Sequence, residues 1–464
     1  MIRLLHAYFP TRTLLLGISE ACVVAFAFVA AAIARLGPND ATLMLGYEQG
    51  AIKILVVSAT FITCMYYFDL YDSATLSNRR EVLARTIQVL GTACVLLTVL
   101  YYVYPPLALG RGIFLIGIIL VAMLLMLSRR LFLMLNTLPK FAERALIFGD
   151  GQLAESLVAE LRTRPELGVR VVGQLKDFEN SNGNSALFSS EERLEALLGL
   201  VKPYKPDRII VAMGERRGKL PVESLLKLKS QGMRVQDGVE VYEAVTGKVS
   251  IESLRLGWLL FSPGFRVSRL LVIYKRVASV VLSAVGLVLA LPLMALTAMA
   301  VRLDSVGPVI FGQRRVGQDG KIFILYKFRT MVDGADRDGD HRPAEIIDSR
   351  FTHVGRLLRR AHMDELPQLF NILRGDMHFV GPRPFVANQE QECLDRIPYY
   401  RQRWVVKPGA TGWAQVNRGY CATIKDNEEK LAYDLFYIKN VSIGLDLLIL
   451  FKTVKILLLG RGSR

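Results

Sequence analysis

Long apolar runs and polar stretches alternate along this chain. Four apolar runs come first, over about Leu14–Ala34, Ile54–Phe68, Ile87–Val103 and Ile113–Leu127. Each approaches the roughly 20 residues that a helix needs to cross about 30 Å of hydrocarbon. The pattern therefore predicts a transmembrane domain of four helices over residues 1–140. The first run is too long for the core of a cleaved signal peptide, and we expect it to stay in the protein.

Basic residues mark one side of these predicted helices. They precede the first run and follow the second and fourth runs, at Arg3, Arg12, Arg79, Arg80, Arg85, Arg129, Arg130, Lys140 and Arg144. The connections after the first and third runs carry only Arg35, Lys53 and Arg111. Because positively charged loops stay on the cytoplasmic side, both ends of the four-helix domain are predicted to face the cytoplasm.

Strand and helix patterns alternate in the next part of the chain, residues 141–269. Strands are predicted at Arg144–Phe148, Arg170–Gly173 and Arg208–Met213, a helix at Leu153–Leu161, and a loop at Asn180–Ser190. This alternation favours a parallel, Rossmann-like sheet in a cytoplasmic domain.

A pair of glycines follows the first of these strands. Gly149 and Gly151 form part of a dinucleotide-binding fingerprint, in which Ala154 takes the third glycine position. A tight strand-to-helix turn without any ligand explains the pair equally well. Because this domain has no Tyr-x-x-x-Lys pair for dehydrogenase or dehydratase chemistry, we expect a regulatory or structural role, and nucleotide binding stays open.

A fifth apolar run, Val277–Val301, is long enough to span a membrane but contains Pro292. Proline removes a helix hydrogen bond and kinks or breaks the helix. Lys275 and Arg276 precede the run, and Arg302 follows it. A helix that bends at Pro292 and returns keeps both basic flanks on the cytoplasmic side, so we predict a re-entrant helix over residues 277–301.

The last run, Ile443–Leu459, has a narrower apolar stripe. Its apolar residues recur at helical spacing, at Leu447, Leu450, Phe451, Val454, Leu457 and Leu458. Asp446, Lys452 and Lys455 interrupt the run. Charges at these positions favour a helix that lies in the membrane interface, and a packed core helix is the alternative.

Composition narrows the range of partners. Apolar residues make up 52% of the 464 residues, and Lys plus Arg exceed Asp plus Glu by 58 to 42, a net charge of +16. A basic surplus indicates nucleic acid, anionic lipid or phosphorylated substrates. Since the apolar runs attach the chain to a bilayer, nucleic acid is not expected. The five cysteines include no CxxC pair, so neither a zinc site nor a disulfide framework is predicted.

The densest polar motifs lie between residues 307 and 419. Tyr326–Met331 alternates apolar and basic residues, as a strand with one charged face would, and includes Lys327. Further along, Asp364 and Glu365 follow Arg359 and precede a proline that is favoured in the first turn of a helix, so both carboxylates are predicted at a helix start. Adjacent carboxylates near arginines suit metal-assisted phosphoryl chemistry. An acidic helix start without any function is the alternative.

A second motif, Gly381-Pro382-Arg383-Pro384, places an arginine between two prolines. The prolines hold Arg383 in a stiff turn, and a planar guanidinium can bind a phosphate with two hydrogen bonds. A rigid surface turn with a solvated arginine is the alternative. Four histidines lie in the same region without metal-ligand spacing, at His341, His353, His362 and His378, and we expect them to be ordinary polar residues.

Taken together, these motifs resemble the bacterial sugar transferases that load a sugar-1-phosphate onto a polyprenyl phosphate, the monotopic phosphoglycosyl transferases. The resemblance covers about Tyr274–Gly460. The whole chain looks like the long form that initiates exopolysaccharide synthesis. The implied fold is membrane α-helical plus α/β: four transmembrane helices, a Rossmann-like domain, and a mostly α catalytic domain over residues 270–464 with the re-entrant and interfacial helices. One position departs, because Leu291 precedes Pro292 where family members often have serine.

The resemblance implies a two-step reaction at the cytoplasmic face of the bacterial inner membrane. Asp364 matches the nucleophile that attacks the β-phosphate of a UDP-sugar, which releases UMP and leaves a sugar-phosphoryl aspartate. Glu365 matches its partner, associated with Mg²⁺ and with activation of the acceptor, and both carboxylates are expected metal ligands. The acceptor, undecaprenyl phosphate, would approach from the bilayer beside the re-entrant helix.

The resemblance also assigns the basic residues of the site. Lys327, Arg359 and Arg383 match positions that stabilise phosphate charge, with Arg383 nearest the nucleotide. Pro382 and Pro384 form the turn at the nucleotide site.

Two alternatives fit parts of the sequence. A membrane nucleotide-sugar dehydratase or reductase centred on the middle domain would bind NAD(P), but it lacks the Tyr-x-x-x-Lys pair and a full glycine fingerprint. A non-catalytic scaffold or sensor of a polysaccharide assembly machine would support polymer production even with Asp364 replaced by Asn. The sugar, the polymer and the oligomeric state, a homodimer included, are not determined by any motif in the chain.

Overall fold

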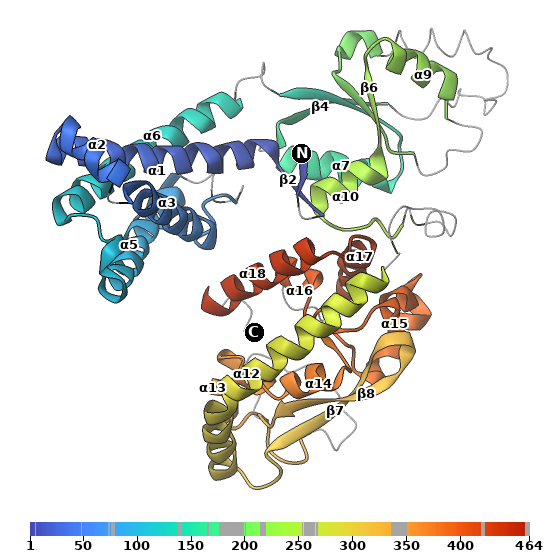
Figure 1. Cartoon of the computed structure of the whole chain (residues 1–464). Coiled ribbons are helices and arrows are strands. Elements are labelled where there is room, and N and C mark those ends of the chain that lie inside the picture. The colour runs from blue at the N-terminus through green and yellow to red at the C-terminus, as the bar shows by residue number, and fades with distance from the viewer. Residues whose placement is uncertain are drawn as a thin grey trace. The chain divides into compact units, whose positions relative to one another are not determined.

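The computed structural model describes residues 1–4, 6–47, 49–72, 75, 79–137, 142–164, 167–175, 199, 201–213, 220–252, 254, 265, 268–335, 350–418 and 423–459. The loop predicted at Asn180–Ser190 and the side chains of Lys140 and His341 lie outside this set. The chain divides into two compact units, the first of residues 1–2 and 8–241, the second of residues 3–7 and 242–464. Figure 1 shows the elements of both units along the chain.

Each of the four apolar runs at the start of the chain corresponds to a helix, and the second run extends one residue, Phe68, past its helix. The elements here are β1 (Ile2–Leu4), β2 (Ala7–Phe9), α1 (Thr11–Leu36), α2 (Pro38–Tyr47), α3 (Gly50–Tyr67), α5 (Arg79–Val103) and α6 (Arg111–Thr137). Helices α1, α3, α5 and α6 are long and apolar enough to cross a membrane. The short helix α2 is an addition that the apolar pattern does not predict.

The interior of this helical part is apolar and aromatic. Phe28 of α1 and Phe61 of α3 are almost fully buried, with ring centroids 6.3 Å apart. On the outside, Phe26 and Leu55 are 64% and 68% exposed. Many other large apolar side chains of these helices are exposed as well. A continuous apolar surface of this kind is unfavourable in water, so the outer surface of these helices indicates a lipid environment.

One ion pair lies inside the same helices. Arg129 Nε of α6 lies 2.8 Å from Glu20 Oε1 of α1, and its guanidinium also donates to the Leu70 carbonyl at 3.2 Å. Glu20 and Arg129 are 0% and 3% exposed. Charges removed from water in this way persist only when they are paired, so the pair holds α1 and α6 in one relative position.

The middle of the chain forms a four-stranded sheet in which all neighbouring strands are parallel. Its strands are β3 (Glu143–Phe148), β4 (Val169–Leu175), β5 (Arg208–Val211) and β6 (Arg234–Asp237), in the order β4-β3-β5-β6. Helices α7 (Gln152–Thr163), α9 (Val222–Ser230) and α10 (Gly238–Thr246) follow strands β3, β5 and β6 along the chain. The predicted parallel sheet, the predicted helix and the three predicted strands are confirmed, except that β5 ends at Val211 and not at Met213. Strand β6 is a further strand.

Gly149 directly follows β3 and forms a turn that only glycine adopts easily. Its φ is +137°, and a Cβ atom there would lie 2.5 Å from the carbonyl oxygen of Ala212, just after β5. Any other residue would be strained in this conformation and would collide with the neighbouring chain. The turn by itself therefore accounts for this glycine.

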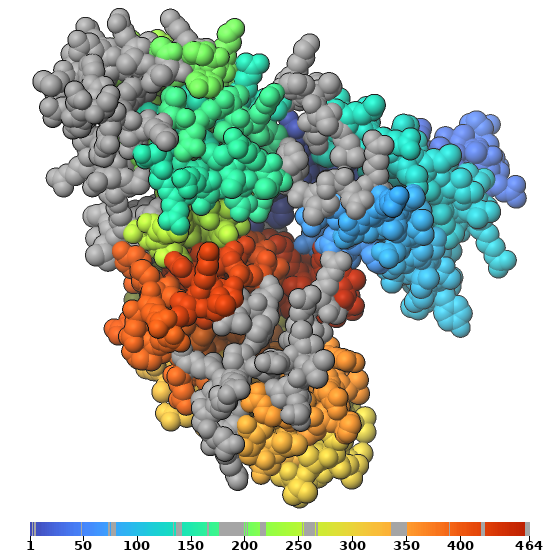
Figure 2. All heavy atoms as spheres, turned by 180° about the vertical axis from the view of Figure 1, so that it is seen from behind, coloured from blue at the N-terminus to red at the C-terminus, as the bar shows by residue number. Residues whose placement is uncertain are grey.

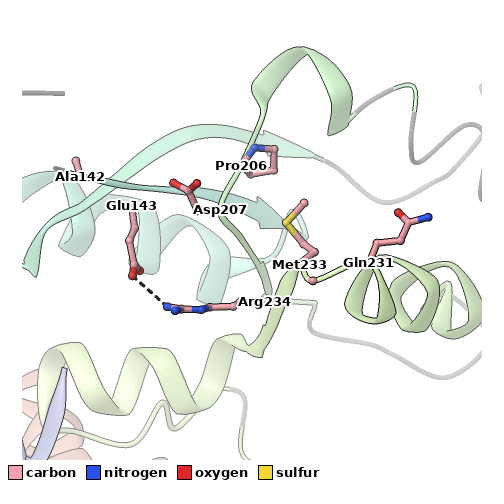
Figure 3. A pocket seen from close by; sticks show the side chains of 8 residues that line it. Ala142, Glu143, Pro206, Asp207, Gln231, Met233 and Arg234 are labelled. Atoms are coloured by element: carbon pink, nitrogen blue, oxygen red, sulfur yellow. Dashed lines mark hydrogen bonds and ion pairs between the residues drawn. The ribbon is translucent and has the colours of Figure 1, made fainter. Parts of the chain in front are cut away.

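A hollow lies at the opposite edge of the sheet, where the strands begin. Its lining residues are Ala142, Glu143, Pro206, Asp207, Gln231, Gly232, Met233 and Arg234. Figure 3 shows them, with Glu143 Oε1 and Arg234 Nη1 paired at 3.1 Å. Ligands of parallel α/β sheets bind at the carboxyl ends of the strands, so this hollow is not where a nucleotide is expected.

The second unit is mainly helical, as predicted, with two small sheets. Its elements are α12 (Arg269–Asp304), β7 (Ile310–Val316), β8 (Ile322–Phe328), α13 (His353–Arg360), α14 (Gln368–Arg374), β9 (His378–Val380), α15 (Glu390–Arg396), β10 (Gly409–Thr411), α16 (Trp413–Asn417), α17 (Ile424–Lys439) and α18 (Ile443–Leu459). Strands β7 and β8 pair antiparallel, and β9 and β10 pair parallel. Figure 2 shows the orange and red residues of the last helices gathered in one body.

The strand predicted at Tyr326–Met331 has different bounds. Strand β8 begins earlier, at Ile322, and ends at Phe328, because the ladder with β7 ends at the pair Ile310–Phe328. Lys327 lies within the strand, whereas Arg329 lies beyond it.

Helix α12 is continuous from Arg269 to Asp304 and contains Pro292. Ser268 caps it, since its Oγ accepts a hydrogen bond from the Leu271 N–H at 3.2 Å. In Figure 1 the ribbon of α12 changes direction before its carboxyl end, as expected for a helix with an internal proline. It is also long and apolar enough to cross a membrane. A re-entrant course for this helix stays a prediction.

Helix α18 has the predicted bounds and two different faces. Leu445 and Ile449 are fully buried, whereas Leu447 and Leu458 of the predicted stripe are 56% and 72% exposed. Asp446 pairs with Lys275 of α12 at 2.7 Å. Its charge is therefore explained by an ion pair within the unit, and only the exposed apolar stripe supports an interfacial position.

Candidate functional site

Asp364 and Glu365 lie in a short 3-10 helix, Met363–Glu365, that joins α13 to α14. His362, the N-cap residue of this helix, has a left-handed backbone conformation with a φ of 53°. Pro367 follows as the N-cap residue of α14. The carboxylates thus lie just before α14, at the helix start that the sequence pattern predicts.

Asn371 connects α14 to strand β8. Its side-chain amide accepts a hydrogen bond from the Tyr326 N–H at 3.0 Å and donates to the Ile324 carbonyl at 2.7 Å. The buried amide therefore pairs with the edge of the strand as a neighbouring strand would. Because Lys327 is the next residue of β8, this contact sets how far the strand lies from the carboxylates.

The carboxylate of Glu365 bridges two cations from two other elements. Lys327 Nζ of β8 and Arg383 Nη2, from the turn after β9, each lie 2.8 Å from Glu365 Oε1. The Glu365 and Lys327 side chains are 24% and 18% exposed. Charge-assisted hydrogen bonds of this length are among the strongest polar contacts in proteins, so they hold the three elements together.

Asp364 lies beside this bridge, and its carboxylate is held less closely than that of Glu365. Its Oδ2 is 4.0 Å from Lys327 Nζ, and the residue is 8% exposed. Lys327 therefore faces both carboxylates, but it donates to only one of them.

Burial and charge shift the pKa values of the two acids in opposite directions. Burial raises the pKa of Asp364 above its ordinary value of 3.8, and the Lys327 charge opposes this shift. Burial also disfavours the Glu365 anion, but Arg383 and Lys327 outweigh it and hold the Glu365 pKa well below 4.5. Two neighbouring carboxyls with pKa values pushed apart are typical of residues with different chemical roles.

The turn that carries Arg383 is held by its neighbours in the small sheet. The Gly409 N–H donates to the Pro382 carbonyl at 3.0 Å, and the Gly381 N–H donates to the Thr411 carbonyl at 2.9 Å. Glu365 raises the pKa of Arg383, which stays a cation. The structure thus brings Asp364, Glu365, Lys327 and Arg383 together, as the sequence predicts.

Arg359 takes a different position from the other predicted cations. It lies in the last turn of α13, with its guanidinium carbon 4.3 Å from the ring centroid of Phe351, in a cation–π contact. Its charge lowers the pKa of Asp364, against the larger effect of burial. Arg359 therefore acts on the nucleophile candidate through its field.

Arg315 also belongs to this group, although no sequence motif assigns it to the site. Its Nη1 donates to the Pro384 carbonyl at 2.7 Å, and its Nε and Nη2 donate to Gln313. Burial, with the charge of Arg383, lowers the Arg315 pKa to about 10. The strand register places Arg315 there, which no local sequence pattern shows. Residue 311 pairs with Lys327, so alternate residues of β7, Arg315 included, share the face of Lys327.

The described part of the chain holds no group of three or more His, Cys, Asp or Glu side chains that could bind a metal ion. Asp364 and Glu365 are the two adjacent oxygen donors at the site. Mg²⁺ is often bound by one or two carboxylates together with substrate phosphates, so these two residues fit an ion that is shared with a phosphate substrate.

Two parts of the chain match known families. Residues 270–460 match the family described as bacterial sugar transferase, and residues 66–227 match a family described as a CoA-binding domain. The first match contains every residue of the site described above.

Individual relatives agree with this assignment. A UDP-N-acetylgalactosamine-undecaprenyl-phosphate N-acetylgalactosaminephosphotransferase of Aeromonas hydrophila is 41% identical over 48% of this chain and 52% of its own length. A UDP-glucose:undecaprenyl-phosphate glucose-1-phosphate transferase of Escherichia coli is 35% identical over 66% of each chain. One of the same description from Caulobacter vibrioides is 43% identical over 43% of this chain and 76% of its own length. The chain thus spans about half of the first relative and just under two thirds of the second.

We predict that Glu365→Gln destabilises the second unit by about 2 kcal/mol, because Lys327 and Arg383 then face each other without a shared anion. All three tryptophans of the chain lie in residues 242–464, so thermal unfolding followed by tryptophan fluorescence reports on this unit.

Glu392→Gln is the matched control for this prediction. Glu392 pairs with Arg396 at the surface, where both side chains are about 60% exposed, and such pairs contribute little. A Glu365→Gln protein that unfolds at or above the wild-type temperature would contradict the bridging role of Glu365.

Proposed function

Because this chain belongs to the bacterial sugar transferase family, we propose that it transfers a sugar-1-phosphate from a UDP-sugar to undecaprenyl phosphate. Relatives described as transferases of this kind differ in their sugar, which is N-acetylgalactosamine in one and glucose in another. The observation that carries the proposal is the buried Asp364 beside Glu365, which Lys327 and Arg383 hold in place.

In the first step, a carboxylate oxygen of Asp364 attacks the β-phosphorus of the UDP-sugar. The bond between this phosphorus and the bridging oxygen breaks, UMP leaves with the electron pair, and a sugar-phosphoryl aspartate forms. The positions of Lys327 and Arg383 support this step, since cations beside the carboxylates stabilise charge on the transferring phosphoryl group. Glu365 keeps both cations oriented while Asp364, which accepts neither of the short hydrogen bonds, is available to react.

In the second step, a phosphate oxygen of undecaprenyl phosphate attacks the phosphorus of the acyl phosphate, and Asp364 is released as a carboxylate. Glu365, the carboxylate next to Asp364 in the chain, would take part in activating this acceptor. Asp364 and Glu365 are also the residues that would hold Mg²⁺, which when bound neutralises part of the diphosphate charge.

We further propose that α12 enters the membrane from the cytoplasmic side, bends, and leaves the membrane on the same side. A helix with this course would allow a lipid acceptor to reach the site from the bilayer. Arg276, near the start of α12, donates to the Ile372 and Leu373 carbonyls at 2.9 and 2.8 Å, so this end is bonded to the helix that follows the carboxylates. The other end is bonded to the same unit, where the Val354 N–H donates to Asp304 at 2.9 Å.

Single cysteines placed after Arg302 test this course of α12. We expect a membrane-impermeant thiol reagent to label them only from the cytoplasmic side, as it labels cysteines placed in residues 142–164. Labelling from the periplasmic side would show that α12 spans the membrane.

We predict that Asp364→Asn lowers UMP release from the cognate UDP-sugar at least 10³-fold, because an amide cannot replace the attacking carboxylate. The assay uses purified full-length protein, Mg²⁺ and a panel of UDP-sugars, with and without undecaprenyl phosphate. Asp395→Asn, an exposed carboxylate in α15, is the control and should release UMP at the wild-type rate. Wild-type rates in Asp364→Asn would exclude the aspartyl intermediate.

The raised pKa of Asp364 predicts the pH dependence of the reaction. The nucleophile must be deprotonated, so kcat/KM is expected to fall as the pH falls through the Asp364 pKa, which burial places above 3.8. Arg359 lowers this pKa, and Arg359→Gln should therefore move the acid limb of the profile to higher pH. Arg360→Gln, which removes an exposed neighbouring charge, should leave the limb nearly unchanged. Equal shifts of the acid limb in both variants would show that the Arg359 charge has no specific effect on the pKa of Asp364.

A further inference from the structure

A second arginine, Arg403, lies behind the turn that carries Arg383. Its Nη2 donates to the backbone carbonyl of Arg383 at 3.0 Å. The same Nη2 pairs with Asp434 of α17 at 2.8 Å, and Nη1 donates to the hydroxyl of Tyr400 at 2.6 Å. Arg403 and Asp434 are 5% and 1% exposed, so this ion pair is enclosed by the protein and cannot itself contact a substrate.

The guanidinium of Arg403 is oriented by aromatic rings as well as by hydrogen bonds. Its central carbon lies 4.9 Å from the ring centroid of Phe385 and 5.0 Å from that of Tyr400. Phe385 directly follows the Gly381–Pro384 turn. A planar cation held by two rings and two acceptors has one orientation, and this orientation aims an N–H at the Arg383 carbonyl.

A buried ion pair of this kind is a poor source of stability. Removing two charges from water costs about as much as their attraction returns, and apolar side chains of similar volume often stabilise a protein equally well. At this position the pair orients the Arg403 guanidinium, which donates a hydrogen bond to the Arg383 carbonyl. An apolar replacement would leave that carbonyl without this donor. The next carbonyl of the turn, that of Pro384, is held in the same way by Arg315.

These contacts form a continuous path from Asp434 through Arg403 to the backbone of Arg383, and from the Arg383 side chain to Glu365. We propose that Arg403, oriented by Asp434, is a positioning residue for Arg383 in the phosphosugar transfer proposed above, on which this inference rests. It acts by fixing the backbone from which the phosphate-binding guanidinium extends.

The first variant to test is Arg403→Lys in the full-length protein. Lysine keeps a positive charge opposite Asp434, but a single ammonium cannot reproduce the fork that reaches Asp434, Tyr400 and the Arg383 carbonyl together. We expect kcat/KM for the UDP-sugar to fall about 10- to 100-fold, with a melting temperature close to that of the wild type. Arg401→Lys, which changes an exposed arginine of the 3-10 helix Tyr400–Val405 that also contains Arg403, should retain full activity.

A double-mutant cycle separates positioning from a general structural effect. If Arg403 acts through Arg383, Arg403→Lys causes no further loss in an Arg383→Gln background. Tyr400→Phe, which removes one acceptor of Arg403 and keeps the ring, should show a smaller loss that also disappears in that background and so tests the inference even if Arg403→Lys folds poorly.

The outcomes distinguish this inference from the proposed function. Full activity of Arg403→Lys, or equal fold losses with and without Arg383, overturns the positioning role alone. Failure of the wild-type protein to release UMP from any UDP-sugar overturns the proposed function, and the inference with it.

Discussion

The bridge made by the Glu365 carboxylate is the constraint on which the rest of the site depends. One oxygen accepts hydrogen bonds from Lys327 and Arg383, which come from a strand and a turn that are distant in sequence. Without this shared anion, the two cations would repel each other. With it, they are held close to a second carboxylate, Asp364, which makes neither short contact. The two adjacent acids therefore differ in their contacts, because only Glu365 is bridged.

The surrounding structure serves mainly to fix the three elements that meet at this bridge. Asn371 fixes the distance between β8 and α14 through the strand edge, and Arg403 and Arg315 fix the turn after β9 through its carbonyls. Each contact joins a side chain to the backbone, so each sets the position of a main-chain segment and not only of one group. Because these contacts orient the charged groups in advance, little free energy is needed to reorganise them when charge develops on a substrate.

Apolar helices and buried ion pairs occur together in both units. Glu20 and Arg129 pair inside the helices at the start of the chain, and Lys275 of α12 pairs with Asp446 of α18 in the second unit. In each case a charged side chain of a largely apolar helix pairs with an opposite charge on another helix. Such pairs specify which helices pack together, a task that apolar contacts alone perform with little selectivity.

The sequence by itself determined the local structure and the chemical character of the chain. Apolar runs located the long helices, alternating strand and helix patterns predicted the parallel sheet, and the motifs at Lys327, Asp364, Glu365 and Arg383 supplied candidate residues that the structure brings together. Hydrophobic periodicity and turn chemistry act over a few residues, so both are present in the sequence itself. Only the tertiary structure decided that Glu365 and not Asp364 is bridged, and that Arg315, Asn371 and Arg403 support the site. Those contacts join residues 18 to 69 positions apart, and no local pattern encodes which distant partner a buried polar group meets.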